Sequence, residues 1–130
     1  MIVLDASAVT ELLLETPAGQ SVTEALAEAQ DALIVPHLLD VEVANALRNL
    51  ASAMRWDLHR SQQYLERLAL LPADRQSHVA LLARVGELRH NFTAYDAVYI
   101  ALAEALDAVL YTCDSKLRNG HRARVRVFHL

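Results

Sequence analysis

Four carboxylates fall at positions where the surrounding sequence is apolar: Asp5, Glu42, Asp96 and Asp114. The first ends the opening apolar run, and the second lies inside an apolar helical segment. The third falls in the first turn of an Ala-rich helical segment, and the last follows a short apolar run typical of a strand. Burying isolated carboxylates is unfavourable unless a positive group or a hydrogen bond meets them. These four acids therefore need a shared partner.

A hard divalent cation is the natural partner for such a set, because it takes oxygen ligands. The six histidines are scattered and Cys113 is the only cysteine, so the sequence offers no cluster of zinc ligands. The expected ion is Mg²⁺ or Mn²⁺. One or two such ions held by carboxylates can activate a water and stabilise the leaving oxygen of a phosphodiester. We expect Asp5, Asp96 and Asp114 to bind directly, and Glu42 to bind directly or through water.

Each acid also has a purely structural interpretation. Asp5 and Asp114 could cap the helices that follow them, and Thr93 with Asp96 has the spacing of a capping box. Glu42 could be a surface residue. However, it lies about one turn inside its helix, between valines, and has no cap to make. Capping therefore explains the three aspartates singly but not the whole set.

Glu42 belongs to a polar seam on an otherwise apolar helix. Asn45 and Asn49 follow it at i+3 and i+7, so the three side chains share one face. Such a seam should face something polar, which makes Asn45 a further candidate site residue. If this seam meets three acids at strand–helix junctions, the like charges repel strongly without a cation between them.

The apolar periodicity predicts short strands separated by helices. Helices are expected over residues 6–15, 17–30, 38–54, 57–70, 76–90 and from Thr93 to about residue 105, with a single turn at 115–119. Strands are expected at 1–5, 33–36, 109–112 and 125–130, with the start of a short strand at 70–72. This alternation predicts the α/β class: a three-layer α/β/α sandwich with a mainly parallel central sheet. Ligands bind such sheets beyond the carboxyl ends of the strands.

Composition indicates one domain over residues 1–130, with 54% hydrophobic residues and a net charge of −4. No apolar run reaches the ~18 residues of a membrane span, and no basic region precedes the first apolar run as in a secretory signal. The single cysteine suits the cytoplasm. Charge is uneven: residues 1–54 hold eight acids and one base, whereas residues 108–130 hold five bases and one acid. The basic end could contact a phosphate backbone or be a solvated tail.

Four segments occur together in the order and spacing of one family: Ile2–Ala8, Glu42–Leu47, Tyr95–Ala103 and Leu110–Leu117. With them the chain resembles the PIN domain, and within it the VapC toxins of bacterial and archaeal toxin–antitoxin pairs. The resemblance implies a Mg²⁺- or Mn²⁺-dependent endoribonuclease that cleaves tRNA or rRNA and stops translation. It also implies a homodimer and a VapB-type antitoxin whose C-terminal segment covers the site, often presenting an arginine.

The resemblance assigns the acidic site to the four carboxylates already singled out: Asp5, Glu42, Asp96 and Asp114. Ser7 matches a family hydroxyl near the metal, and Thr112 matches one that precedes the last acid. None of the expected acids is missing. Tyr95 and Tyr99 are expected in the core or at a dimer contact rather than as platforms for stacked bases.

Two other functions are considered. A phosphotransferase of the haloacid dehalogenase type would require a second acid two residues after Asp5, and Ser7 occupies that position. A non-catalytic PIN-like scaffold that docks RNA or a protein would not need the complete set of acids. Divalent-ion binding distinguishes the nuclease from the scaffold.

Overall fold

Five short strands form one sheet in which every neighbouring pair is parallel, in the order β3-β2-β1-β4-β5. The computed structural model describes all 130 residues. The central strands are apolar and buried, as strands covered on both faces must be, whereas the edge strands carry polar and charged residues. The strands are β1 (Ile2–Leu4), β2 (Leu33–Pro36), β3 (Asp74–Gln76), β4 (Val109–Thr112) and β5 (Arg124–Val127).

Six α-helices and two 3₁₀ turns connect these strands. Four α-helices begin at a side chain that accepts a backbone N–H, which satisfies a donor that the first turn leaves free: Asp5, Thr16, Asp57 and Thr93. The helical elements are α1 (Ala6–Leu14), α2 (Pro17–Ala29), α3 (Leu38–Met54), α4 (Leu58–Ala69), η1 (Val79–Leu81), α5 (Leu82–Glu87), α6 (Ala94–Leu106) and η2 (Ser115–Leu117).

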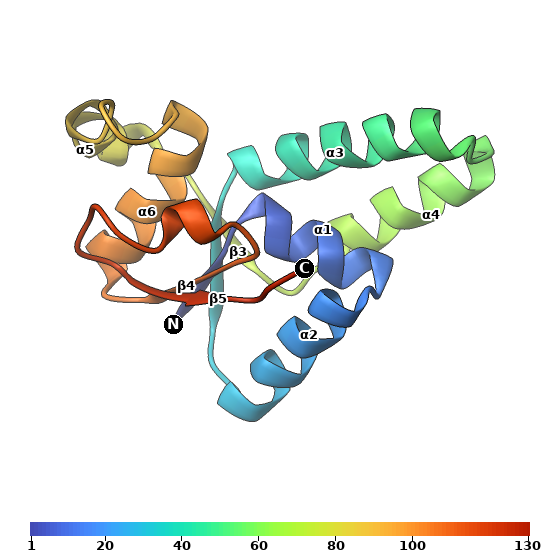
Figure 1. Cartoon of the computed structure of the whole chain (residues 1–130), viewed down its shortest axis with the longest axis horizontal. Coiled ribbons are helices and arrows are strands. Elements are labelled where there is room, and N and C mark those ends of the chain that lie inside the picture. Colours follow the sequence, from blue (N-terminus) through green and yellow to red (C-terminus); the bar gives the residue numbers. More distant parts are fainter.

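The helices form two layers around the sheet, which confirms the predicted α/β/α sandwich. Figure 1 shows α5 and α6 on one side and α1 to α4 on the other, with α3 and α4 extending from the body as a pair. The helix α6 is buried along most of its length and packs on β1, β2 and β4. On the opposite layer, α2 crosses α1 so closely that a Cβ on Gly19 would lie 1.9 Å from the carbonyl oxygen of Glu11. No helix combines the length and apolarity needed to cross a membrane.

Three expected boundaries are wrong. The strand anticipated at residues 70–72 forms later, as β3. The helix anticipated over residues 76–90 is reduced to η1 and the six-residue α5, because Gln76 belongs to β3 and the chain must turn before a helix begins. The last strand ends at Val127 rather than at residue 130. These errors concern the two edge strands, β3 and β5, and the segment that follows β3.

Candidate active site

The parallel sheet brings the predicted acids toward one edge. Strands β1 and β4 are neighbours, with Leu4 aligned to Tyr111. The next residues of the two chain segments, Asp5 and Thr112, therefore lie together at the carboxyl ends of the two strands. The next strand, β2, leads into α3 and thus to Glu42. Because α6 runs into the start of β4, its own N-terminal turn returns to the same carboxyl edge. Topology alone therefore places the four acidic segments together.

Asp5 is the fixed centre of this edge. It is buried, and its Oδ1 accepts hydrogen bonds from the Ser7 hydroxyl at 2.7 Å and the Ala8 N–H at 2.9 Å. Its Oδ2 accepts a short hydrogen bond from the Thr112 hydroxyl. Burial raises the pKa of Asp5, and these three donors lower it in part. The charge of Asp96 raises that pKa further, so the two carboxylates lie within each other's field.

Two hydroxyls connect Asp5 to the turn that carries Asp114. The Ser7 Oγ accepts the backbone N–H of Cys113 at 2.9 Å and lies 3.3 Å from the Thr112 Oγ1. The Thr112 Oγ1, which is fully buried, accepts the backbone N–H of Asp114 at 3.0 Å. The side chain of Asp114 accepts the N–H of Lys116 and so begins η2. Ser7 and Thr112 therefore hold two of the acidic segments together.

Asp96 lies half-buried in the first turn of α6. Thr93 caps that turn by accepting the Asp96 N–H at 3.2 Å, as the capping interpretation predicted. Burial raises the pKa of Asp96, and the nearby charge of Asp114 raises it further. The positive charge of Lys116 lowers the pKa of Asp96, which places that lysine within the field of the acids.

Glu42 is half-buried on α3, and one of its oxygens is held. Its Oε1 accepts a hydrogen bond of 2.7 Å from the hydroxyl of Tyr99, a residue of α6. Burial raises the pKa of Glu42; the hydrogen bond from Tyr99 lowers it, and the charges of Asp96 and Asp5 raise it again. Tyr99 was expected only as a core or contact residue. Its spacing of three residues from Asp96 on one helix face is the signal that could have included it.

The four carboxylates thus occupy one electrostatic neighbourhood. Asp5, Glu42 and Asp96 act on one another, and Asp114 acts on Asp96. All the atoms that these carboxylates offer to a metal ion are hard oxygen ligands, the type that Mg²⁺ and Mn²⁺ prefer. No group of three or more His, Cys, Asp or Glu side chains is close enough to form a ready-made metal site. The structure therefore brings the acids near one another without arranging them as a finished coordination shell. Asn45, by contrast, is exposed.

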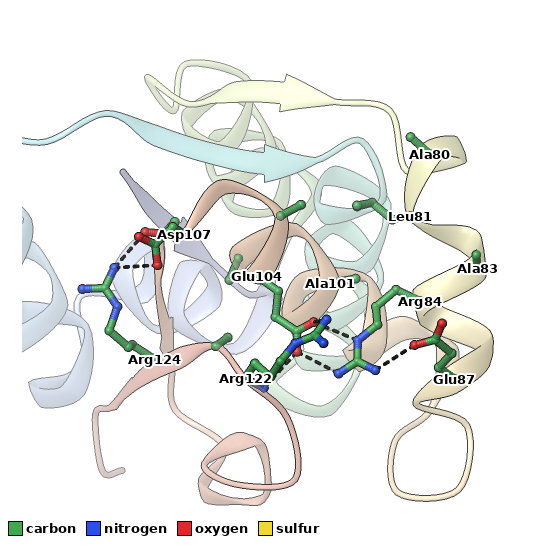
Figure 2. Close-up of a pocket in the computed structure, with 14 residues that line it drawn as sticks. Ala80, Leu81, Ala83, Arg84, Glu87, Ala101, Glu104, Asp107, Arg122 and Arg124 are labelled. Atoms are coloured by element: carbon green, nitrogen blue, oxygen red, sulfur yellow. Dashed lines mark hydrogen bonds and ion pairs between the residues drawn. The ribbon is translucent and has the colours of Figure 1, made fainter.

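The two largest cavities lie elsewhere, and neither is lined by any of the four acids. One, of about 660 Å³, lies between α5, α6 and the segment before β5, near the C-terminal end of α6. Figure 2 shows Glu104 at its centre, contacted by Arg84 and Arg122, with Asp107 and Arg124 paired at the rim. The other, of about 650 Å³, lies between α3 and α4.

Comparison with known proteins gives consistent results. The family model described as "PIN domain" matches residues 2–121. Ribonuclease VapC9 of Mycobacterium tuberculosis is 39% identical over 124 residues, covering 95% of this chain and 94% of that protein. Ribonuclease VapC12 of the same species is 36% identical over 129 residues, covering 98% of each. The crystal structure of VapBC2 from Rickettsia felis, bound to a DNA fragment from its promoter, superposes with a TM-score of 0.73 at 15% identity over 98% of this chain and 99% of that one.

Proposed function

Because this chain belongs to the PIN domain family, in its VapC branch, we propose that it is the toxin ribonuclease of a toxin–antitoxin pair and cleaves RNA with Mg²⁺ or Mn²⁺ at the acidic edge. The observation that carries the proposal is the shared field of the four carboxylates: the charge of Asp96 raises the pKa of Asp5, the charges of Asp96 and Asp5 raise that of Glu42, and the charge of Asp114 raises that of Asp96. A bound cation relieves that repulsion. RNA is the substrate class that the names of the VapC relatives support.

Asp5, Asp96 and Asp114 would hold the ion, and Glu42 would contribute directly or through water. When bound, Mg²⁺ or Mn²⁺ activates water for attack on phosphorus and offsets the negative charge on the departing oxygen. The protein's own part begins with Asp5, whose three donors fix both carboxylate oxygens and favour the ionised form. The other three acids are at least partly exposed, so substrate can reach them.

The substrate would be held by positive charge beside the acids. Lys116, whose charge acts on Asp96, stands next to the site and can pair with an RNA phosphate. Arg118, two residues after Lys116, is also exposed and extends this positive region, whereas Arg122 and Arg124 pair with Glu104 and Asp107 near the other end of α6. We propose tRNA or rRNA as the RNA that is cut, in the cytoplasm, so that translation stops.

Two partners follow from the same proposal. A VapB-type antitoxin would silence the enzyme by laying its C-terminal segment over the acidic edge and presenting an arginine to the carboxylates, which compensates their charge as a cation does. The protein would act as a homodimer.

Replacing Asp5 by asparagine tests the proposal. Asn is also a good helix cap, so α1 should still begin correctly, while the charge that binds the ion is lost. We expect cleavage of tRNA and rRNA in Mg²⁺ or Mn²⁺ to fall by more than about 100-fold, since a direct ligand should matter at least as much as the outer partners of a metal site. EDTA should abolish cleavage by the wild-type protein.

The matched control is Asp107→Asn, because Asp107 is 98% exposed and lies at the other end of α6. It should cleave RNA at the wild-type rate. Undiminished cleavage by Asp5→Asn, or indifference of the wild-type protein to EDTA, would contradict the proposed function. A wild-type protein that binds no divalent ion and leaves RNA intact would instead be described better as a non-catalytic PIN-domain scaffold.

A further inference from the structure

Tyr99 connects the core of the molecule to the acidic edge. Its side chain is only 1% exposed, yet its hydroxyl donates a hydrogen bond of 2.7 Å to Oε1 of Glu42, a residue 57 positions away in sequence. Tyr99 follows Asp96 by three residues on α6, so the two side chains lie on the same face of that helix. One buried ring therefore spans from the helix that carries Asp96 to the helix that carries Glu42.

Glu42 needs such a partner more than Asp5 and Asp114 do. Asp5 is fixed at both oxygens by three donors, and Asp114 is fixed by the N–H of Lys116 in the turn that it starts. Glu42 lies inside a helix, where no backbone N–H is free, and its side chain has one more rotatable bond than an aspartate. The Tyr99 hydroxyl is its hydrogen-bond donor, and it contacts Oε1 alone.

We propose that Tyr99 is a positioning residue of the site: by holding Oε1 of Glu42, it presents Oε2 to the divalent cation. This inference rests on the proposed metal-dependent ribonuclease function and adds a residue that acts through Glu42. Outer partners that orient the ligands of a metal site commonly change metal affinity or activity by about 10- to 100-fold when they are removed. Tyr99 is placed to act in that way.

The competing explanation is that the buried Tyr99 hydroxyl simply requires an acceptor. Buried tyrosine hydroxyls usually find one. In that case Glu42 would only satisfy the Tyr99 hydroxyl, and Tyr99 would not orient Glu42 for metal binding. The two explanations differ in one measurable respect. A structural role predicts that loss of the hydroxyl changes stability and leaves metal affinity unchanged, whereas the positioning role predicts weaker metal binding by a protein that is still folded.

The test is Tyr99→Phe, which keeps the buried ring and removes only the hydroxyl. Mn²⁺ binding is measured by calorimetry on the full chain without RNA, after circular dichroism has confirmed folding. We expect Mn²⁺ affinity to fall by about 10-fold or more. Tyr111→Phe is the matched control, because Tyr111 is also buried but its ring packs on Phe128. The Mn²⁺ affinity of this variant should equal that of the wild type.

A double-mutant comparison identifies the route of the effect. In a Glu42→Gln background, Tyr99→Phe should cause no further loss of Mn²⁺ affinity, because the residue acts only through the carboxylate of Glu42. Glu42→Asp gives a second measurement that leaves the buried tyrosine untouched: the shorter carboxylate withdraws from the hydroxyl, and Mn²⁺ affinity should fall as in Tyr99→Phe.

Wild-type Mn²⁺ affinity in either Tyr99→Phe or Glu42→Asp overturns the inference and leaves the proposed function intact, as does a full additional loss from Tyr99→Phe in the Glu42→Gln background. A wild-type protein that binds no Mn²⁺ overturns the proposed function and this inference together. The two failures are therefore distinguishable.

Discussion

Replacing Glu104 by glutamine should destabilise the protein near neutral pH and much less in acid. The Glu104 side chain is only 7% exposed, and its carboxylate accepts two hydrogen bonds from Arg84, at 2.8 and 3.0 Å, and the backbone N–H of Arg122 at 2.9 Å. Figure 2 shows this carboxylate between the two arginines. One side chain of α6 thus holds α5 and the segment that returns from η2 to β5. Glutamine keeps the shape and one acceptor but loses the charge.

The magnitude follows from the carboxyl pKa. The hydrogen bonds from Arg84 are the main cause that lowers the pKa of Glu104 from 4.5 to about 2, and they raise the pKa of Arg84. At about 1.4 kcal/mol for each pKa unit, that difference corresponds to about 3 kcal/mol of stability. Water screens part of it, because the side chain of Arg84 is 25% exposed, so we expect Glu104→Gln to lower the free energy of unfolding by about 2 kcal/mol.

The sign of the pH dependence is fixed by the direction of the pKa change. Because the folded-state pKa lies below the unfolded-state value, the contribution is fully present above about pH 5 and is lost as pH falls toward 2. Urea unfolding of the wild type and of Glu104→Gln at pH 7 and at pH 3 measures it. The difference between the two proteins should shrink to less than about half at pH 3.

Glu87→Gln is the control in the same cluster. Glu87 also pairs with Arg84, at 3.0 Å, but its side chain is 64% exposed. Its replacement should cost no more than about 0.5 kcal/mol at either pH. Equal losses for Glu104→Gln at pH 7 and pH 3, or a loss at pH 7 no larger than that of Glu87→Gln, would refute the electrostatic account of this cluster.

Two further predictions, each with a control substitution, test the packing and the site. Gly19→Ala should lower the free energy of unfolding in urea by more than about 3 kcal/mol, because the new Cβ would meet the carbonyl of Glu11. In the control Gly86→Ala, the new Cβ meets nothing within 4 Å, so the substitution should raise the free energy of unfolding by up to about 1 kcal/mol. Equal effects of the two substitutions would contradict the packing argument. Thr112→Val should lower the free energy of unfolding by about 1–3 kcal/mol, because it removes the buried hydroxyl that donates to Asp5. It should also weaken Mn²⁺ binding. The control Thr112→Ser retains the hydroxyl, so its stability and Mn²⁺ affinity should stay near those of the wild type.

The central part of the fold could be predicted because its signals are local. The buried strands are apolar runs, the long helices have helical apolar spacing, and cap residues mark their starts. The edge strand β3 could not be predicted in this way, since it consists of Asp74, Arg75 and Gln76. Its position depends on pairing with β2 and on the Arg75 guanidinium, which donates to Asp40, a residue 35 positions away, as well as to nearby carbonyls. Tertiary contacts of this kind leave no pattern in the local sequence.

The site divides in a similar way. The four acids were identifiable because a carboxylate in apolar sequence is conspicuous, and the parallel topology then brings them to one edge. Ser7 and Thr112 came only from the family resemblance, because their hydrogen bonds join positions more than 100 residues apart. Tyr99 was assigned to the core or a contact, since a tyrosine in an apolar helix has the pattern of a packing residue. Its burial was expected, but the sequence does not show which residue accepts the hydrogen bond from its hydroxyl.

Capping and ion binding are compatible roles at this edge. Asp5 and Asp114 do cap the elements that follow them, by accepting the N–H groups of Ala8 and Lys116. A parallel sheet whose strands lead directly into helical turns places such caps side by side, and each cap holds its carboxylate at a fixed point beside N–H groups that favour negative charge. The backbone contact therefore offsets part of the cost of keeping a charge at a buried strand end. For this reason Asp5→Asn, which retains the cap and removes the charge, separates the structural role from the proposed chemical one.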